Sequence, residues 1–335
     1  MKMSETILTK EQAMELSSCA LAASGATQDN AVITAEALVR AEFDGQKGHG
    51  LSRVPSYCAQ LRTGKVNGRA QPVLQRVKPG LLRIDASNGF AYPAIRLALP
   101  ELGKRAKDLG IAAAAIYHSH HFGVAGHPCE DLAREGCIAF IYGNTPKAIA
   151  PFGAKEKVLG TNPIAFAAPG EEDPLVIDFA VSAVARGKIM AARQAGQNIP
   201  EGWALAPDGE PTTDPDTALQ GSMVPIGGAK GAALALMVEV MSGCLAGAAL
   251  SVEAGSLFEG VGDPPNLGQV LLAIDAQALS ADAFGSRFKD LAAVYDRTEG
   301  ARFPGLKRLQ NRKAGAEQGV AVPAALVGEI KYLTH

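Results

Sequence analysis

The sequence predicts a mixed α/β protein, and two observations lead to that prediction. Of its 335 residues, 47% are hydrophobic and 20% are charged, a composition typical of a chain that buries a large core in one or two domains. From Pro72 onward, short apolar runs with strand character alternate with longer segments of helical periodicity. Taken alone, this alternation favours a parallel, doubly wound sheet.

Helices are expected to occupy the first 64 residues of the chain. Thr9 and Gln12 have the spacing of a capping box, which predicts a helix that ends near Gly25. Asp29 or Asn30 is expected to cap a second helix, because apolar side chains then recur at helical spacing. The second helix is expected to end at Phe43. The third is expected to span residues 54–62 and to be closed by Gly64.

Strands and helices are expected to alternate through the rest of the chain. The predicted strands are residues 81–86, 111–117, 137–142, 162–168, 175–179 and 270–275. The predicted helices are residues 94–109, 128–135, 183–194, 230–245, 283–295 and 323–332. Pro100 is expected to break or kink the first of these helices, and residues 200–221 are expected to be mostly loop.

Charge and cysteine content argue against several classes of protein. Lys and Arg total 32 against 34 Asp and Glu, a formal net charge of -2, so no overall field attracts nucleic acid or an anionic membrane. The first residues lack the apolar core of a signal peptide, and no run of about 18 apolar residues follows. We therefore expect a cytoplasmic protein with no membrane and no nucleic-acid partner. The five cysteines are far apart and form no CxxC pair, which argues against a disulfide framework and a zinc ribbon.

Several motifs of common enzyme classes are missing. No GxGxxG follows a predicted strand, so a standard Rossmann phosphate turn is absent from the sequence. No GxxxxGK[ST], HExxH or GxSxG occurs either. Their absence weakens the NTPase, zinc-protease and serine-hydrolase interpretations.

A histidine between two glycines is the first candidate for chemistry. His49 is followed by Arg53 and Tyr57 at four-residue steps. If a helix begins near residue 51, these two side chains project from one face and the imidazole lies over its N-terminal end. Arg53 would then bind both oxygens of a small carboxylate while His49 transfers a proton near neutral pH. Spacing alone leaves the alternative open, a surface histidine followed by a surface arginine.

Three further histidines, His118, His120 and His121, follow the apolar segment 111–117. Clustered imidazoles ligate metals, but no acidic or thiol side chain has matching spacing, and successive strand residues point to opposite faces. We therefore expect no metal site, and both a ligand-binding turn and a structural role stay open. Asp178, at the end of the apolar segment 175–179, either touches a ligand or caps a turn.

Two glycine-rich turns are candidates for anion binding, GTNP at 160–163 and GGAKG at 227–231. In the second, backbone amides and Lys230 stand at the start of an alanine-rich helix, where phosphate binds favourably. Short glycine-rich turns are common, so each is weak support by itself.

Together these segments resemble the malate/L-lactate dehydrogenase family of NAD(P)-dependent oxidoreductases, which lack a Rossmann fold. The resemblance spans nearly the whole chain. It is carried, in order, by His49-Gly50 with Arg53 and Tyr57, by SHHFG at 119–123, by GTNP at 160–163, by Asp178 with Ser182 and RGK at 186–188, and by GGAKG at 227–231.

Within this family, RIDASNGFA at 83–91 and RFPGLKR at 302–308 are most similar to the Δ1-piperideine-2-carboxylate/Δ1-pyrroline-2-carboxylate reductases. This resemblance implies NADPH-dependent reduction of a cyclic imino acid to L-pipecolate or L-proline, with NADH as the alternative cofactor. One alternative is a NAD(P)-dependent 2-hydroxy acid dehydrogenase of the malate, lactate or ureidoglycolate type, which would act on a 2-keto acid in the reverse direction. A second alternative is an inactive relative that only binds ligand.

The resemblance also implies roles for individual residues. His49 would be the proton donor, and Arg53, Tyr57 and Thr161 would contact the substrate. The implied cofactor contacts are His121, Phe122, Gly123, Val124, Ala125, Asp178, Phe179, Ala180, Ala229, Lys230, Arg302, Pro304, Gly305, Lys307 and Arg308.

Cofactor choice has a physical basis in the last of these segments. A 2'-phosphate requires nearby cations, and Lys307 with Arg308 would supply them, which favours NADPH. Two positions depart from the reductase pattern. Gly48 replaces a serine, and Lys188 replaces an acid, as in the hydroxy-acid branch of the family.

The resemblance further implies an architecture that the alternation of elements does not predict. A mostly helical catalytic domain would be formed from both chain ends, residues 1–80 and 300–335. Residues 81–299 would form a cofactor domain with a large, mainly antiparallel sheet. The protein would assemble as a homodimer.

Overall fold

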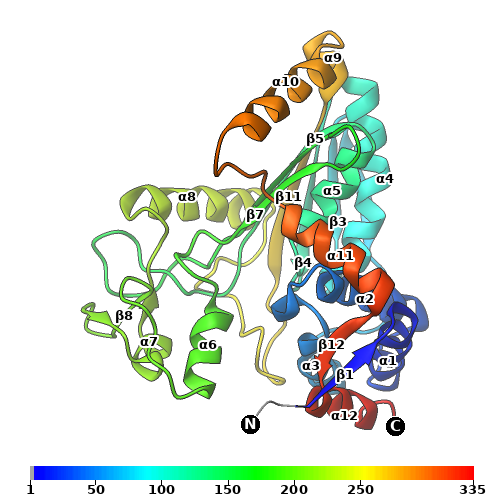
Figure 1. Cartoon of the computed structure of the whole chain (residues 1–335). Helices are drawn as coiled ribbons and strands as arrows, with labels where there is room; N and C mark the ends of the chain where they lie inside the picture. Colours follow the sequence, from blue (N-terminus) through cyan, green and yellow to red (C-terminus); the bar gives the residue numbers. More distant parts are fainter. Residues whose placement is uncertain (1–3) are drawn as a thin grey trace.

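A seven-stranded sheet in the order β2-β3-β4-β11-β5-β6-β7 lies at the centre of the computed structural model, which describes residues 4–335 (Figure 1). Its strands are β2 (Val73–Lys78), β3 (Leu81–Asp85), β4 (Ile111–Ser119), β5 (Cys137–Gly143), β6 (Ile164–Ala168), β7 (Leu175–Phe179) and β11 (Leu267–Asp275). Only β3 and β4 are parallel, and all other neighbours in this sheet are antiparallel. The mixed α/β class and the mainly antiparallel sheet are confirmed.

The parallel, doubly wound sheet expected from alternation is wrong, and β11 shows why. This strand comes from late in the chain and lies between β4 and β5, antiparallel to both. Ala273 pairs with Ala112 on one side and with Ala139 on the other. Alternation along the sequence gives no information about such an insertion, because the pairing of distant segments is decided by tertiary packing.

Two helices cover one face of the sheet, α4 (Ala91–Leu109) and α5 (Gly126–Arg134). Figure 1 shows them side by side along β3, β4 and β5. Small buried side chains such as Ala94, Ala98 and Ala114 let the helices approach the strands closely. The break expected at Pro100 is absent, since α4 continues through it. Pro100 is exposed, so water can satisfy the backbone carbonyl that its missing N–H leaves free.

The two ends of the chain form a second hydrophobic cluster. It contains α1 (Lys10–Ala23), α2 (Gln28–Phe43), α3 (Val54–Thr63) and α12 (Ala324–Tyr332), together with the antiparallel pair β1 (Glu5–Leu8) and β12 (Val320–Pro323). The capping box at Thr9 and Gln12 is confirmed, and Gly64 closes α3 in a left-handed conformation, φ 78°. The cap expected at Asp29 or Asn30 is wrong, because Thr27 caps α2 and accepts a hydrogen bond from the amide of Asn30.

A third cluster lies beyond the strand β7. It contains residues of α6 (Arg186–Gln194), α7 (Pro215–Gln220) and α8 (Ala229–Glu239), beside a small sheet. The π-helical segment η3 (Val240–Leu245) continues α8. That sheet has the order β10-β8-β9, from β8 (Ala204–Leu205), β9 (Pro211–Thr212) and β10 (Ser222–Met223). The segment 200–221, expected to be mostly loop, thus carries two short strands and α7.

The remaining helices are α9 (Ala276–Ser280), α10 (Phe284–Arg297) and α11 (Leu306–Gln318). In Figure 1, α11 crosses from the sheet toward α2. β2 precedes residue 81 and already belongs to the large sheet. The division into residues 1–80 with 300–335 and residues 81–299 stays a prediction. Within residues 4–335, no helix combines the length and the apolar character needed to cross a membrane.

Candidate active site

A buried carboxylate, that of Glu42, holds the loop that carries His49. Two 3-10 turns, η1 (Lys47–His49) and η2 (Leu51–Arg53), connect α2 to α3. The amide of Leu51 donates to Oε2 of Glu42 at 2.9 Å. Gly50 is required at this point, because a Cβ there would collide with the Glu42 carboxylate. Burial raises the pKa of Glu42.

His49 is half-buried and contacts a second imidazole. Its Nδ1 lies 3.2 Å from Nε2 of His121, and the two rings stack with their centroids 5.1 Å apart. Burial, followed by the positive charge of Arg53, lowers the pKa of His49 to about 4. Burial likewise holds the pKa of His121 well below its ordinary value. Both rings are therefore neutral near pH 7, and Nε2 is the nitrogen of His49 that stays free for a ligand.

Tyr57 lies behind this pair and does not face solvent. Its hydroxyl is 2.6 Å from Nδ1 of His121 and 3.2 Å from the hydroxyl of Tyr92. Tyr57 is 0% exposed, and its hydroxyl contacts His121 and not the open side of the site. A contact of Tyr57 with substrate stays a prediction. Burial raises the pKa of Tyr57 to about 12.

Arg53 is the half-buried cation beside His49. Its Nε donates to the carbonyl oxygen of Gly48 at 2.8 Å, which folds the side chain back along the His49 loop. The guanidinium carbon lies 4.8 Å from the centroid of the Phe258 ring. Gln60 and Lys65 hold the loop around Phe258, because their side chains donate hydrogen bonds to backbone carbonyls of that loop. Among residues 4–335, no carboxylate forms an ion pair with Arg53, so its terminal nitrogens are available to an anionic ligand.

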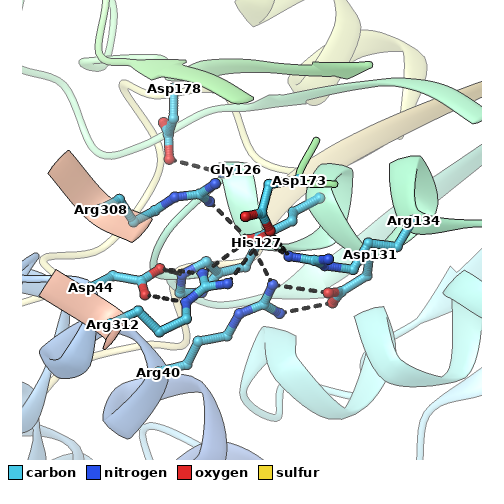
Figure 2. A network of polar contacts seen from close by, with 11 residues as sticks. Arg40, Asp44, Gly126, His127, Asp131, Arg134, Asp173, Asp178, Arg308 and Arg312 are labelled. Atoms are coloured by element: carbon cyan, nitrogen blue, oxygen red, sulfur yellow. Dashed lines mark hydrogen bonds and ion pairs between the residues drawn. The ribbon is translucent and has the colours of Figure 1, made fainter. Parts of the chain in front are cut away.

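A second polar site lies at the N-terminus of α5 (Figure 2). Oδ2 of Asp178, at the end of β7, accepts from the amide of Gly126 at 2.8 Å. Burial raises the pKa of Asp178 to about 6, against the lowering effect of that amide and of Arg308. Figure 2 shows Arg308 beside Asp178. Arg308 is buried and donates through Nη1 to Glu130 at 2.8 Å, whereas its Nε and Nη2 have no partner within residues 4–335.

These features fit a nucleotide cofactor. Buried polar atoms without partners carry a large free-energy cost, which an anionic or hydroxyl-bearing ligand at Arg308 would remove. The positive end of the α5 dipole favours a phosphate nearby, although the amides of Gly126 and His127 already donate to Asp178 and Val124. Asp178 is a suitable acceptor for a hydroxyl group. Gly123 precedes this helix at φ +68°, where a Cβ would lie 2.7 Å from the hydroxyl of Tyr92, so only glycine fits here.

Arg308 and three other arginines surround one buried carboxylate. Glu130, on α5, is 0% exposed and pairs with Arg40, Arg134, Arg308 and Arg312 at 2.8 to 3.0 Å. The guanidinium groups hold the pKa of Glu130 far below its ordinary value in spite of its burial. Arg312 also pairs with Asp44, which accepts from His127 at 2.9 Å. This network joins α2, α5 and α11 and fixes Arg308 beside Asp178 (Figure 2).

The other residues predicted to contact the cofactor differ in how deeply they are buried. Phe122, Val124 and Ala125 are buried between β4 and α5. The segment after β7 is joined to the turn before α8 by the amide of Ile226, which donates to Val181 at 2.8 Å. The remaining predicted contacts are exposed or half-buried: Phe179, Ala180, Ala229, Lys230, Arg302, Pro304, Gly305 and Lys307.

Some predicted residues are not brought together. The hydroxyl of Thr161 lies 3.1 Å from that of Thr145, and no hydrogen bond joins Thr161 to His49 or Arg53 in the described chain. The histidine cluster diverges, since His118 pairs with Asp85 and His127 pairs with Asp44. In the part of the chain that the structure describes, no three His, Cys, Asp or Glu side chains are arranged to hold a metal ion.

Sequence reasoning missed four residues that shape the site. Tyr92, Glu42, Phe258 and Glu130 lie outside the motifs, and their contacts with the site form only on folding. The one local signal was an acid, Glu42, between Ala41 and Phe43 at the end of an apolar helical run, since a buried acid requires a specific partner.

Comparisons with known proteins show what the chain resembles in sequence and fold. Residues 8–331 match the sequence profile of the malate/L-lactate dehydrogenase family. A (2R)-3-sulfolactate dehydrogenase (NADP(+)) of Chromohalobacter salexigens is 47% identical over 326 residues, 97% of each chain. A Delta(1)-pyrroline-2-carboxylate reductase of Ancylobacter novellus is 40% identical over 93% of each chain. The crystal structure of a delta1-piperideine-2-carboxylate reductase from Pseudomonas syringae pvar. tomato has a TM-score of 0.93 at 34% identity, covering 98% of this chain and 99% of that one.

Proposed function

We propose that this chain, which belongs to the malate/L-lactate dehydrogenase family of oxidoreductases, is an NADP(H)-dependent dehydrogenase of a small 2-hydroxy acid. The observation that carries the proposal is a guanidinium, Arg53, that has no ion-pair partner within residues 4–335 and is folded against the loop of a neutral imidazole, His49. One group binds a carboxylate and the other accepts a proton from the adjacent hydroxyl.

The substrate carboxylate binds to Nη1 and Nη2 of Arg53, because Nε is already taken by the carbonyl of Gly48. This fork fixes the orientation of C2 and its hydroxyl, and positioning of this kind contributes several kcal/mol to catalysis, about 7 to 11 at best. Phe258 packs under the guanidinium and keeps it in place.

His49 accepts the hydroxyl proton at Nε2, since Nδ1 is occupied by His121. Its low pKa keeps the base form present at neutral pH. In the reverse direction Nε2–H returns the proton to the carbonyl oxygen of a 2-keto acid. When bound, NADP(H) exchanges a hydride with C2 of the substrate.

Asp178, Arg308 and the positive end of the α5 dipole are the groups that would hold the cofactor. Arg302 and Lys307 are exposed cations on the same segment, and they would favour a 2'-phosphate. Arg308, by contrast, already shares its charge with Glu130. We therefore assign the preference for NADPH over NADH mainly to Lys307 and Arg302.

Two features favour a hydroxy acid over a cyclic imino acid as the substrate. Gly48 and Lys188 both depart from the imine-reductase pattern, and Lys188 matches the hydroxy-acid branch. The relative of 47% identity is named as a dehydrogenase of a hydroxy acid, (2R)-3-sulfolactate.

Reduction of a cyclic imino acid is the second candidate function. The segments 83–91 and 302–308 favour it, as do the reductase of 40% identity and the reductase structure with a TM-score of 0.93. Arg53 would bind the same carboxylate, and His49 would supply or hold the proton on the imine nitrogen.

The deciding experiment compares kcat/KM across both substrate classes. NADP+ is offered with (2R)-3-sulfolactate, malate, lactate and ureidoglycolate, and NADPH with the matching keto acids and with Δ1-pyrroline-2-carboxylate and Δ1-piperideine-2-carboxylate. We expect a hydroxy-acid pair to exceed both imines by at least about tenfold in kcat/KM. Faster imine reduction would establish the second candidate. Cofactor binding without any turnover would identify an inactive relative.

Assembly as a homodimer stays a prediction, which sedimentation velocity tests.

A further inference from the structure

We propose that His121, Tyr57 and Tyr92 form a proton path from His49 to water in a groove behind the active site. The proposal rests on the proposed function, because the path has a use only if His49 exchanges a proton with a substrate. It adds Tyr57 and Tyr92 to the reaction as positioning residues.

Three short contacts connect the four side chains in a row. Nδ1 of His49 is 3.2 Å from Nε2 of His121, and Nδ1 of His121 is 2.6 Å from the hydroxyl of Tyr57. That hydroxyl is 3.2 Å from the hydroxyl of Tyr92. Each group in the row can both donate and accept a hydrogen bond. Two hydrogen-bond arrangements therefore satisfy all four groups. In one, every proton points toward His49, and in the other every proton points away from it.

The surroundings keep the row neutral in both arrangements. No carboxylate of residues 4–335 hydrogen-bonds to any of the four groups. The nearby titratable and charged groups are Arg53, His120 and His127, all of which oppose a positive charge on His49 or His121. Burial raises the pKa of Tyr92 well above its ordinary value. A proton is thus expected to pass along the row without resting on any member as a charge.

The last residue of the row is one of those that line a groove. Tyr92 lines a groove of about 810 Å³ between α2, α4 and α5, although the side chain itself is only 7% exposed. Arg40, Asp44 and His127 also line this groove, so its wall is partly polar and holds water readily. Gly123 adjoins the Tyr92 hydroxyl, where a side chain would block it.

During oxidation, one proton passes from the substrate along the row to water in the groove. The substrate hydroxyl gives its proton to Nε2 of His49, and Nδ1–H of His49 passes to Nε2 of His121. Nδ1–H of His121 then passes to the oxygen of Tyr57, and the Tyr57 proton passes to the oxygen of Tyr92. Tyr92 releases its original proton to water in the groove. One proton leaves the substrate, one enters the water, and all four side chains end neutral.

The row returns to its starting arrangement after the product has left. One proton then enters at Tyr92 from the groove, and one leaves Nε2 of His49 to water in the open site. The path therefore matters while bound substrate and cofactor exclude water from the front of His49.

The activity test uses Tyr92→Phe and Tyr57→Phe, with Tyr117→Phe as the control because Tyr117 lies outside the row. We expect both row variants to lower the single-turnover rate of hydroxy-acid oxidation about tenfold to a hundredfold with little change in KM. In H2O/D2O mixtures, the wild type should show a curved proton inventory, and Tyr92→Phe should show a linear one. An unchanged inventory in Tyr92→Phe would overturn the path.

A second readout does not depend on turnover. In protein labelled with 15N-histidine, Tyr57→Phe should shift the ring-nitrogen resonances of both His49 and His121, because the row sets their tautomers. Tyr117→Phe should leave them unchanged. Unchanged resonances in Tyr57→Phe would overturn the path, whatever the substrate. Failure to oxidise any hydroxy acid would count against the proposed function alone, and the resonances would still decide the path.

Discussion

Nδ1 of His49 lies 3.2 Å from Nε2 of His121, and the two rings stack at a centroid distance of 5.1 Å. Two imidazoles this close disfavour protonation of each other, in addition to the effect of burial and of Arg53. The candidate proton acceptor is therefore kept neutral by its neighbours, without a carboxylate partner.

Replacing His49 by alanine should lower kcat/KM for hydroxy-acid oxidation about 10²- to 10⁴-fold, the usual range for loss of a general base. The Kd of NADPH should stay within about twofold of wild type, because His49 is not among the groups assigned to the cofactor. In wild type, the pKa of His49 near 4 keeps the base form present from pH 8 down to about 5. The pH profile of kcat/KM should therefore be flat over that range and fall toward pH 4. An acid limb near 6.5 would mean that His49 has its ordinary pKa.

Arg53→Lys should lower kcat/KM about tenfold to a hundredfold, although the charge is kept. A lysine ammonium cannot bind both oxygens of a carboxylate as a planar fork does, and a hydrogen bond to a charged group is worth about 1.5 to 3 kcal/mol. Steady-state kinetics measure the effect. Arg62→Lys is the matched control, because Arg62 is an exposed arginine in the last turn of α3 whose side chain lies by Leu333. Equal losses in both variants would remove Arg53 from the site.

Glu130→Gln should reduce the free energy of unfolding by about 3 to 5 kcal/mol, since four arginines would lose their buried counter-ion. Asp131→Asn removes a different partner of the same Arg40, but at a side chain that is 42% exposed. It should cost at most about 1 kcal/mol. Urea denaturation measures both, and similar losses would show that burial of Glu130 contributes nothing extra.

Lys307→Glu should raise the Kd of NADPH about tenfold, equivalent to roughly 1.4 kcal/mol, while the Kd of NADH changes little. The reason is the proposed contact of Lys307 with a 2'-phosphate. Isothermal titration calorimetry gives both constants. Lys313→Glu makes the same charge change at an exposed position farther along α11. If Lys313→Glu weakens NADPH binding as much, the effect comes from overall charge and not from a local contact.

His120→Leu should stabilise the protein. Both ring nitrogens of His120 are buried without partners among residues 4–335, and each such group costs about 1 to 3 kcal/mol. Burial also lowers the pKa of His120 to about 3, below the value of about 6.5 in an unfolded chain.

The stabilisation should also depend on pH with a defined sign. The unfolded wild type binds a proton at residue 120 below pH 6.5 that the folded protein does not, so folding loses up to about 1.4 kcal/mol per pH unit as pH falls from 6.5 toward 3. The leucine variant lacks this loss, and its advantage should grow over that window. Thermal or urea unfolding at pH 7 and pH 5 checks this, and an advantage that shrinks at pH 5 would contradict it.

Local patterns predicted the segments whose inward face is apolar. The capping box at Thr9, the closing glycine at Gly64 and the run 175–179 of β7 all depend on residues within a few positions of one another. The motif order around His49 and Arg53 likewise sufficed to identify the family, because each motif is short and continuous.

α11 shows where such reasoning stops. Its inward residues include Arg308 and Arg312, which pair with Glu130 and Asp44. A helix whose buried side is charged has no apolar periodicity to detect, since its partners come from other helices.

The sequence by itself determined which chemical groups are available: an imidazole between glycines, a nearby guanidinium and glycine-rich turns beside apolar segments. Only the tertiary structure decided which of them meet. It inserted β11 between β4 and β5, buried Tyr57 behind His121, and set Arg308 beside Asp178. These relationships join residues tens to hundreds of positions apart, and their energies come from burial and pairing in the folded chain, which no local pattern contains.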